Sequence, residues 1–262
     1  LIHNLRSSCM IHSNTASTER RFMFTSTRIS QCVTSRFAPS QRWMKIWSYI
    51  MQYMLETKNV SVSWTSHVSA TYEKDETLPK NAFASALDRG VEWYRNALML
   101  PSMSRLVDLN AHQSTSTIVP FPGTTAYKSS NGQLGVFEGF TSDVLAENGT
   151  NPQSINIRND CTSETAMAFA IRCRILNKSD DCDVASNILS FAWQHSGIQQ
   201  TFNPPHGSPQ DTFGLLAWET NGAAYDMFYK DDDARSLLAG LAVSSLLKTE
   251  RFKQNIVLAM LA

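Results

Sequence analysis

The sequence lacks an excess of charge of either sign and a long apolar run. Its 262 residues contain 23 lysines and arginines against 23 aspartates and glutamates. A balanced charge gives no electrostatic basis for binding nucleic acid or an anionic membrane surface. No apolar run approaches the roughly 20 residues that a helix needs to cross a bilayer, so no membrane span is expected.

Cysteine is scarce, and its spacing matches no metal or redox motif. The five cysteines form no C-x-x-C pair and no His/Cys spacing of the kind found in zinc sites. We expect mostly free thiols, although Cys173 and Cys182 are close enough in sequence to meet across a helix hairpin. The chain also lacks G-x-S-x-G, H-E-x-x-H, P-loop and G-x-G-x-x-G motifs. It therefore predicts neither a metal nor a cofactor.

Hydrophobic residues make up 42% of the chain and charged residues 18%, which is sufficient for a sizeable core. Apolar residues recur every three or four positions in several segments, which predicts amphipathic helices. These segments are residues 42–56, 81–100, 163–176, 183–195, 232–247 and 250–262. Residues 102–159 and 198–229 lack this period, so we expect long irregular loops there, with short strands near residues 117–119 and 135–137.

The predicted helices come in pairs separated by long loops, which is typical of α/α toroids and solenoids. We therefore expect a mainly α fold, an α/α toroid of helix hairpins with minor β-structure. The predicted helices are fewer than a closed ring of six hairpins requires, which leaves an incomplete toroid open. Residues 1–40 are rich in Ser, Thr and Arg, and they predict an irregular extension before a domain at residues 41–262.

One group of carboxylates lies where a helix is predicted to begin. Asp160 and Glu164 flank the start of the 163–176 segment. Asp160 is explained as an N-cap that accepts a hydrogen bond from a free backbone amide, and Glu164 as a partner of the helix dipole. The starts of alternate helices lie on one rim of a toroid, however, so both residues are also candidates for an acid or base in a central cleft.

A second group is the run Asp231-Asp232-Asp233. One of these residues is explained as the cap of the following helix, but three carboxylates exceed what a cap needs. Crowded like charges raise the pKa of at least one carboxyl group, as a general acid requires near neutral pH. Solvated surface acids are the alternative, and the spacing matches no calcium-binding loop.

Three segments resemble bacterial six-hairpin glycosidase-like proteins, and the resemblance covers about residues 65–255. They are Thr71 to Asp75 with Leu78 to Ala84, then Asp160-Cys161-Thr162-Ser163-Glu164-Thr165-Ala166-Met167-Ala168, and Asp231-Asp232-Asp233-Ala234-Arg235-Ser236. The resemblance implies an (α/α)6-barrel fold, a role in polysaccharide degradation and a secreted or periplasmic location.

From these features we expect a glycoside hydrolase that acts on a poly- or oligosaccharide through a pair of carboxylates. The expected catalytic residues are Asp160, Glu164, Asp231 and Asp232. The residues expected to contact the substrate are Glu138, Trp218, Tyr225, Arg235 and His112. The alternatives are a non-catalytic glycan-binding toroid, an inactive partial domain, and an α/α scaffold for protein partners. Carboxylates facing each other across a cleft favour the enzyme, whereas carboxylates engaged in caps and ion pairs favour binding alone.

Overall fold

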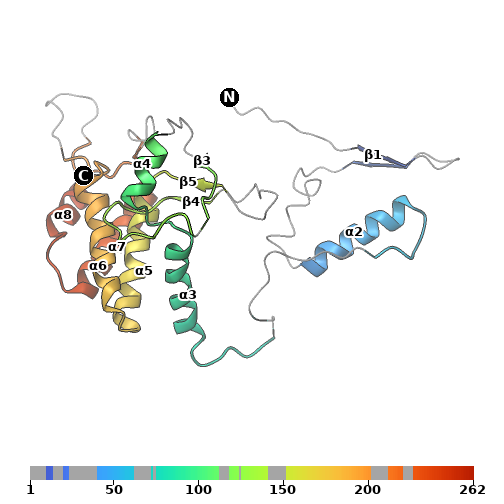
Figure 1. The fold of residues 1–262 in the computed structure, drawn as a ribbon, viewed down its shortest axis with the longest axis horizontal. Coiled ribbons are helices and arrows are strands. Elements are labelled where there is room, and N and C mark those ends of the chain that lie inside the picture. Colours follow the sequence, from blue (N-terminus) through green and yellow to red (C-terminus); the bar gives the residue numbers. More distant parts are fainter. Residues whose placement is uncertain are drawn as a thin grey trace. The chain divides into compact units, whose positions relative to one another are not determined.

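The computed structural model describes residues 10–13, 20–23, 40–61, 72, 75–111, 118–123, 125–140, 152–201, 212–220 and 227–262 (Figure 1). The chain divides into two compact units, Leu1–Leu78 and Pro79–Ala262. The expected boundary between residues 40 and 41 stays a prediction, because residues 24–39 lie outside the described part.

The described part of the first unit contains two short strands and one helix. Strands β1 (Met10–Ser13) and β2 (Arg20–Met23) pair antiparallel. The expectation of an irregular extension missed both strands, because four residues are too few to show a clear alternating pattern. Helix α2 (Ser40–Met54) confirms the helix predicted from residue 42. Ile50 and Met54, one helical turn apart, are buried.

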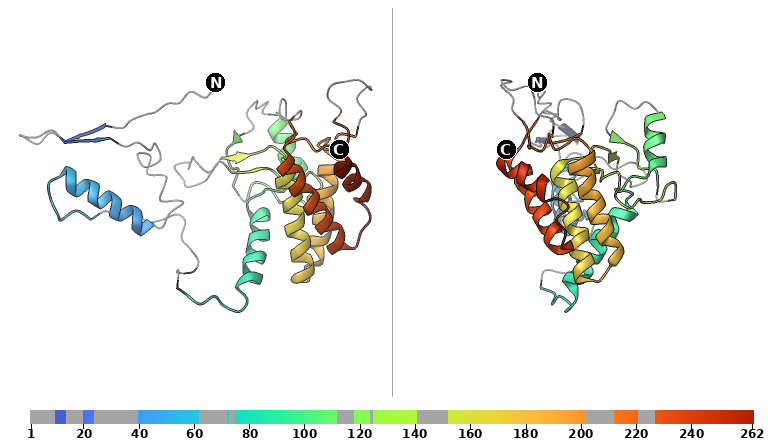
Figure 2. Two further views of the ribbon diagram at one scale, coloured as in Figure 1. Left: turned by 180° about the vertical axis from the view of Figure 1, so that it is seen from behind. Right: turned by 90° about the vertical axis from the view of Figure 1, so that its left-hand side faces the viewer.

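The second unit is mainly helical, as the sequence predicts, and the helices between residues 159 and 261 lie side by side in both Figure 1 and Figure 2. Helix α6 continues into a π-helical turn, η2 (Phe191–His195). Among the described residues of this unit the α-helices are α3 (Ala82–Asn96), α4 (Met103–Ala111), α5 (Asn159–Ile175), α6 (Ser179–Ser190), α7 (Lys230–Leu247) and α8 (Lys253–Leu261).

Helix α4 lies in a stretch where the sequence predicts no helix. None of its residues described for burial is buried, and only Leu106 and Leu109 pack against the core. Two leucines three positions apart form too weak a stripe for the helical period to be recognised.

Helices α5 and α7 are parallel neighbours. Arg235 near the start of α7 contacts Asp160 near the start of α5, and Arg174 near the end of α5 donates to the carbonyl of Leu246 near the end of α7. Helix α6 follows α5 through a short turn, and α8 follows α7 in the same way. Both α5 and α7 therefore begin at the same end of the unit.

A disulfide joins the end of α5 to the start of α6. Cys173 and Cys182 are bonded with their Cα atoms 5.4 Å apart, whereas Cys161 is a free thiol. The possibility that Cys173 and Cys182 meet across a helix hairpin is therefore confirmed. The hairpin brings together two cysteines that are nine positions apart in the sequence.

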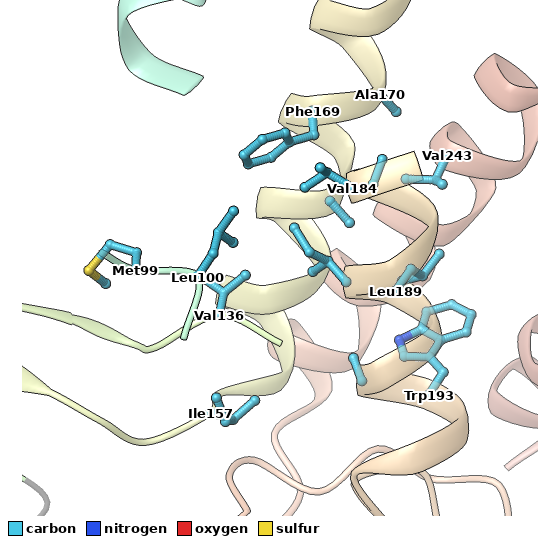
Figure 3. Packing of buried hydrophobic residues seen from close by; sticks show 14 of the residues in the cluster. Met99, Leu100, Val136, Ile157, Phe169, Ala170, Val184, Leu189, Trp193 and Val243 are labelled. Atoms are coloured by element: carbon cyan, nitrogen blue, oxygen red, sulfur yellow. The ribbon is translucent and has the colours of Figure 1, made fainter. Parts of the chain in front are cut away.

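The core lies between α5, α6 and α7, with residues after α3 closing one side (Figure 3). Phe169 on α5, Ile188 on α6 and Val243 on α7 are fully buried. Trp193 of η2 is 1% exposed and lies against Gly240 of α7, where any β-carbon would overlap the ring. The glycine therefore allows α7 to approach the indole closely.

A small antiparallel sheet covers the end of the unit where α5 begins. Its strands are β3 (Ile118–Val119), β4 (Gly139–Phe140) and β5 (Gln153–Ser154), in the order β3-β5-β4. The strand expected near residues 117–119 is confirmed, whereas the one expected at residues 135–137 forms a few residues later. Beyond β5, Arg158 pairs antiparallel with Glu219 just before α5 begins. This extended segment leads the chain into the candidate site.

Candidate functional site

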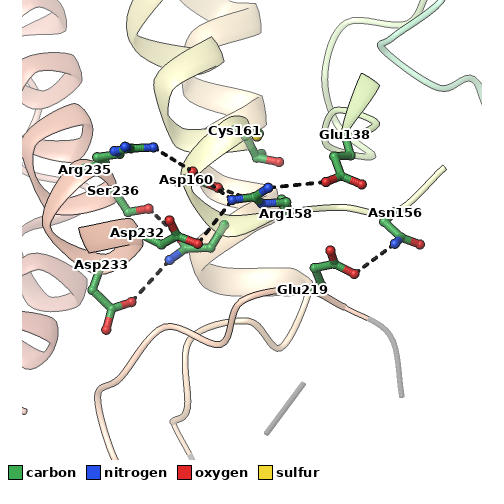
Figure 4. Close-up of polar contacts among 12 residues, drawn as sticks. Glu138, Asn156, Arg158, Asp160, Cys161, Glu219, Asp232, Asp233, Arg235 and Ser236 are labelled. Carbon is green, nitrogen blue, oxygen red and sulfur yellow. Dashed lines mark hydrogen bonds and ion pairs between the residues drawn. The ribbon is translucent and has the colours of Figure 1, made fainter. Parts of the chain in front are cut away.

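Polar side chains share one face of the extended segment that precedes α5. Alternate residues of an extended chain point to opposite sides, so Ser154, Asn156 and Arg158 lie on the same side, and Ile157 is buried on the other. The hydroxyl of Ser154 donates to Glu138 Oε2 at 2.8 Å, and Asn156 Nδ2 donates to Glu219 Oε2 at 2.8 Å. We call this set of five residues, Glu138, Ser154, Asn156, Arg158 and Glu219, the polar face, and Figure 4 labels all of them except Ser154.

Arg158 connects the polar face to the starts of both parallel helices. Its Nε lies 3.1 Å from Asp160 Oδ1, and its Nη1 lies 3.4 Å from Glu138 Oε1. Its Nη2 reaches Asp160 Oδ2 at 3.3 Å and Asp232 Oδ2 at 3.4 Å. One guanidinium group therefore holds carboxylates from the loop before β4, from α5 and from α7.

Asp160 is 2% exposed, and both of its oxygens accept hydrogen bonds from guanidinium groups. The second group is Arg235, whose Nη1 lies 3.4 Å from Asp160 Oδ2. The expectation that Asp160 caps the helix is wrong, because Arg158 occupies the cap position and Asp160 lies within the first turn. Its carboxylate is directed to the arginines and not to free backbone amides.

The run Asp231-Asp232-Asp233 lies within the first turn of α7, and Tyr229 occupies the cap position. The expectation that one of these three residues is the cap is therefore wrong. Asp232 is 5% exposed and faces Arg158, whereas Asp231 is exposed. Burial, and then the charge of Asp160, raise the pKa of Asp232 above its usual value, although Arg158 opposes this effect.

Asn159 fixes the start of α5 against the start of α7. Its side chain is fully buried, with Nδ2 donating to Asp233 Oδ1 at 3.3 Å and Oδ1 accepting from the Ser236 hydroxyl at 2.7 Å. These two bonds place Asp232 beside Arg158 (Figure 4). Burial, and then the charge of Asp232, raise the pKa of Asp233 to about 6.

Replacing Asp233 by asparagine is expected to raise the midpoint temperature of thermal unfolding above pH 6. A raised pKa means that ionisation of Asp233 costs free energy in the folded state that it does not cost in the unfolded chain. This cost is absent near pH 3.8, grows as the pH rises towards about 6, and is complete above that. The asparagine carbonyl still accepts from Asn159 but carries no charge.

The measurement is the midpoint of thermal unfolding for the wild type and the Asp233→Asn variant at pH 4 and pH 7. We expect a gain from the substitution at pH 7 that disappears at pH 4. Asp231→Asn removes an exposed carboxylate from the same helical turn and serves as the matched control. A gain of equal size at both pH values would contradict the prediction.

The structure brings together only some of the predicted site residues. Asp160, Asp232, Glu138 and Arg235 meet around Arg158, and the Trp218 ring lies beneath the Arg158 guanidinium at 5.4 Å. Glu164 is exposed on α5, as Asp231 is on α7. His112 and Tyr225 lie outside the described residues. The catalytic and substrate-contact roles of all these residues stay predictions.

Sequence reasoning missed Asn156, Arg158, Asn159 and Glu219. The alternation of polar and apolar residues from Ser154 to Arg158 was the one available signal for a strand with a polar face. No local pattern marks Glu219, which reaches the site through its antiparallel pairing with Arg158.

Within the described ranges, no three or more His, Cys, Asp or Glu side chains are grouped so as to hold a metal ion. None of the helices in those ranges has the length and apolar character needed to cross a bilayer. Comparison of the chain with protein-family models, curated proteins and solved structures finds no match. The case for function therefore rests on the polar face and the residues around it.

Proposed function

We propose that the second unit is part of an α/α toroid whose polar face hydrolyses glycosidic bonds in a poly- or oligosaccharide. The repeated arrangement of the helices supports the toroid. Helices α5 and α7 are parallel neighbours, and each is followed by a further helix, α6 or α8. In such a repeat the starts of the parallel helices share one rim. From the resemblance to six-hairpin glycosidase-like proteins, we expect the acidic site on that rim.

The hydrolase proposal rests on one observation. Neighbouring carboxyl groups around Arg158 differ in their ion pairing and in the effect of burial on their pKa values. Asp160 accepts hydrogen bonds from both Arg158 and Arg235, whereas burial raises the pKa of Asp232 and of Glu219. Hydrolysis of a glycosidic bond needs one carboxylic acid and one ionised carboxylate. Environments that push neighbouring carboxyl groups towards different protonation states supply both.

A second candidate is a glycan-binding domain without catalysis, and the contacts of Asp160 favour it. Both oxygens of Asp160 are engaged by arginines, and Asp232 also pairs with Arg158. Carboxylates held in this way organise a surface but do not transfer protons readily. The two candidates differ in whether any glycan is cleaved.

The test is the release of reducing sugar from a panel of soluble plant and microbial glycans. We expect the wild type to cleave at least one glycan, and Asp160→Asn and Asp232→Asn to lower the rate. Glu250→Gln is the control, because its side chain is 82% exposed and its one ion pair with a described residue is to Lys253. Binding without cleavage favours the second candidate, and equal rates in all variants would exclude these carboxylates from the reaction.

A further inference from the structure

We infer that the disulfide between Cys173 and Cys182 is a redox-sensitive lock that keeps helix α3 docked on the α5–α6 hairpin. The disulfide joins the last turn of α5 to the first turn of α6, whereas the polar face lies where α5 begins. The inference therefore goes beyond the proposed function and does not depend on it. Reduction of the disulfide is expected to loosen α3 more than α7.

Asp181 bridges three helices beside this disulfide. It lies in the first turn of α6 and is 2% exposed. Its Oδ1 accepts a hydrogen bond from Arg95 of α3, and its Oδ2 lies 3.1 Å from Nη1 of Arg172 on α5. Buried ion pairs are favourable only when their geometry is closely held. The position of this one carboxylate therefore decides how well α3 is held on the hairpin.

The disulfide fixes the position of Asp181. Cys182 follows Asp181 on α6, and Cys173 follows Arg172 on α5, so the covalent bond and the ion pair join the same two turns. The backbone amides in the first turn of a helix have no partners within the helix. The cap residue of α6, Lys178, makes no side-chain hydrogen bond to that turn. Without the disulfide, the turn that carries Asp181 is expected to open more often.

Helix α3 buries little of its own surface. Ala82 and Val91 are its only buried residues. Two further contacts with α5 use the arginine that pairs with Asp181. Nε of Arg172 donates to Asp88 Oδ1 at 2.9 Å, and its Nη2 donates to Glu92 Oε2 at 3.2 Å. The docking of α3 therefore depends strongly on the charged groups beside the disulfide.

Release of α3 would uncover part of the core. The guanidinium of Arg95 lies 4.8 Å from the centre of the Phe169 ring, and the ring of Tyr94 lies 6.2 Å from the same ring. Phe169 on α5 is fully buried. Opening of the lock is therefore expected to expose an apolar face of α5 that α3 covers in the oxidised protein.

The lock opens by thiol–disulfide exchange with a dithiol reductant. Cys182 is partly exposed, whereas Cys173 is 5% exposed, so a thiolate of the reductant attacks the sulfur of Cys182. The bond between the two cysteines breaks, and Cys173 leaves as a thiolate that takes up a proton. The second thiol of the reductant then displaces Cys182 and closes the reductant's own disulfide. Two electrons and two protons pass from the dithiol to the cysteine pair.

The test is amide hydrogen exchange of the full chain with and without dithiothreitol. After reduction, we expect exchange in α3 and in the first turn of α6 to become at least about tenfold faster. Exchange in α7 should rise several-fold less, and its retained protection shows that the protein is folded. The double variant Cys173→Ser/Cys182→Ser should match the reduced protein in both buffers. Cys161→Ser removes a free thiol and keeps the disulfide, so it should respond to dithiothreitol as the wild type does.

A second pair of variants tests the bridge without changing the disulfide. Asp181→Asn is expected to speed exchange in α3 in the absence of reductant. Asp180→Asn removes an exposed carboxylate from the same turn and should leave α3 unchanged. Equal rises in α3 and α7 after reduction, or no rise in α3, would overturn the lock. Unchanged exchange in α3 of Asp181→Asn would overturn the role of the bridge, and a disulfide that stays closed in dithiothreitol would overturn its redox sensitivity.

Discussion

The Arg158→Ala substitution is expected to lower the free energy of unfolding by about 3–5 kcal/mol, the usual result of removing one partner from buried ion pairs. The side chain of Arg158 is 25% exposed, but its partners Asp160 and Asp232 are 3% and 6% exposed. Its loss leaves two buried carboxylates near each other without this shared cation. The cost arises mainly from these uncompensated charges.

The measurement is urea unfolding of the wild type and the variant, followed by tryptophan fluorescence. Arg235→Ala is the control, because Arg235 also contacts Asp160 but its side chain is 53% exposed. Exposed ion pairs contribute about 0–1 kcal/mol, so the control should lose little. The loss in Arg158→Ala should shrink at acidic pH, where protonation neutralises the stranded carboxylates. Equal losses in both variants would contradict the central role of Arg158.

The Gly240→Ala substitution is expected to lower the free energy of unfolding by about 1–3 kcal/mol, the typical cost of overpacking a core. The added β-carbon would lie 2.2 Å from Cη2 of Trp193 and 2.9 Å from Cζ2. Trp193 is 1% exposed and its indole nitrogen donates to Ser163, so the ring has little freedom to move. Either the ring must shift or α7 must move away from η2.

Gly90→Ala on α3 is the matched control for this prediction. Nothing lies within 4 Å of a β-carbon added at Gly90, so alanine there should stabilise the helix by about 0.5–1 kcal/mol. The two glycine substitutions should therefore have opposite signs in the same urea assay. The cost of Gly240→Ala should also fall in a Trp193→Phe background, because phenylalanine lacks the atoms that clash. Equal changes in the free energy of unfolding at the two glycines would show that α7 can move away from Trp193 at no cost, which would contradict the prediction.

Helix positions were the part of the fold that the sequence predicted well. The periodic segments at residues 183–195 and 232–247 correspond to α6 with η2 and to α7, because their apolar stripes face a shared core. Helix α5 begins four residues before its predicted start, at Asn159. Its first turn is polar, and Asn159, Asp160 and Thr162 are buried through hydrogen bonds. The hydrophobic period does not reveal such a turn, because the residues buried in it are polar.

The candidate site was only partly predictable, for a related reason. The acidic runs at the starts of α5 and α7 are visible because charged residues cluster within the sequence. Glu219 and Asn156 join them through a hydrogen bond between residues 63 positions apart. Such a pairing leaves no local pattern, so neither residue can be distinguished from an ordinary loop residue in the sequence.

The sequence by itself determined the helical class and placed acidic residues at two helix starts, since periodicity and charge clustering are local properties of the chain. Tertiary structure alone decided that α5 and α7 run parallel and that their acidic starts meet at Arg158. It also decided which of the described carboxylates pair with Arg158. Burial raises the pKa of Asp232 and of Glu219, and that burial depends on contacts between segments that are far apart along the chain.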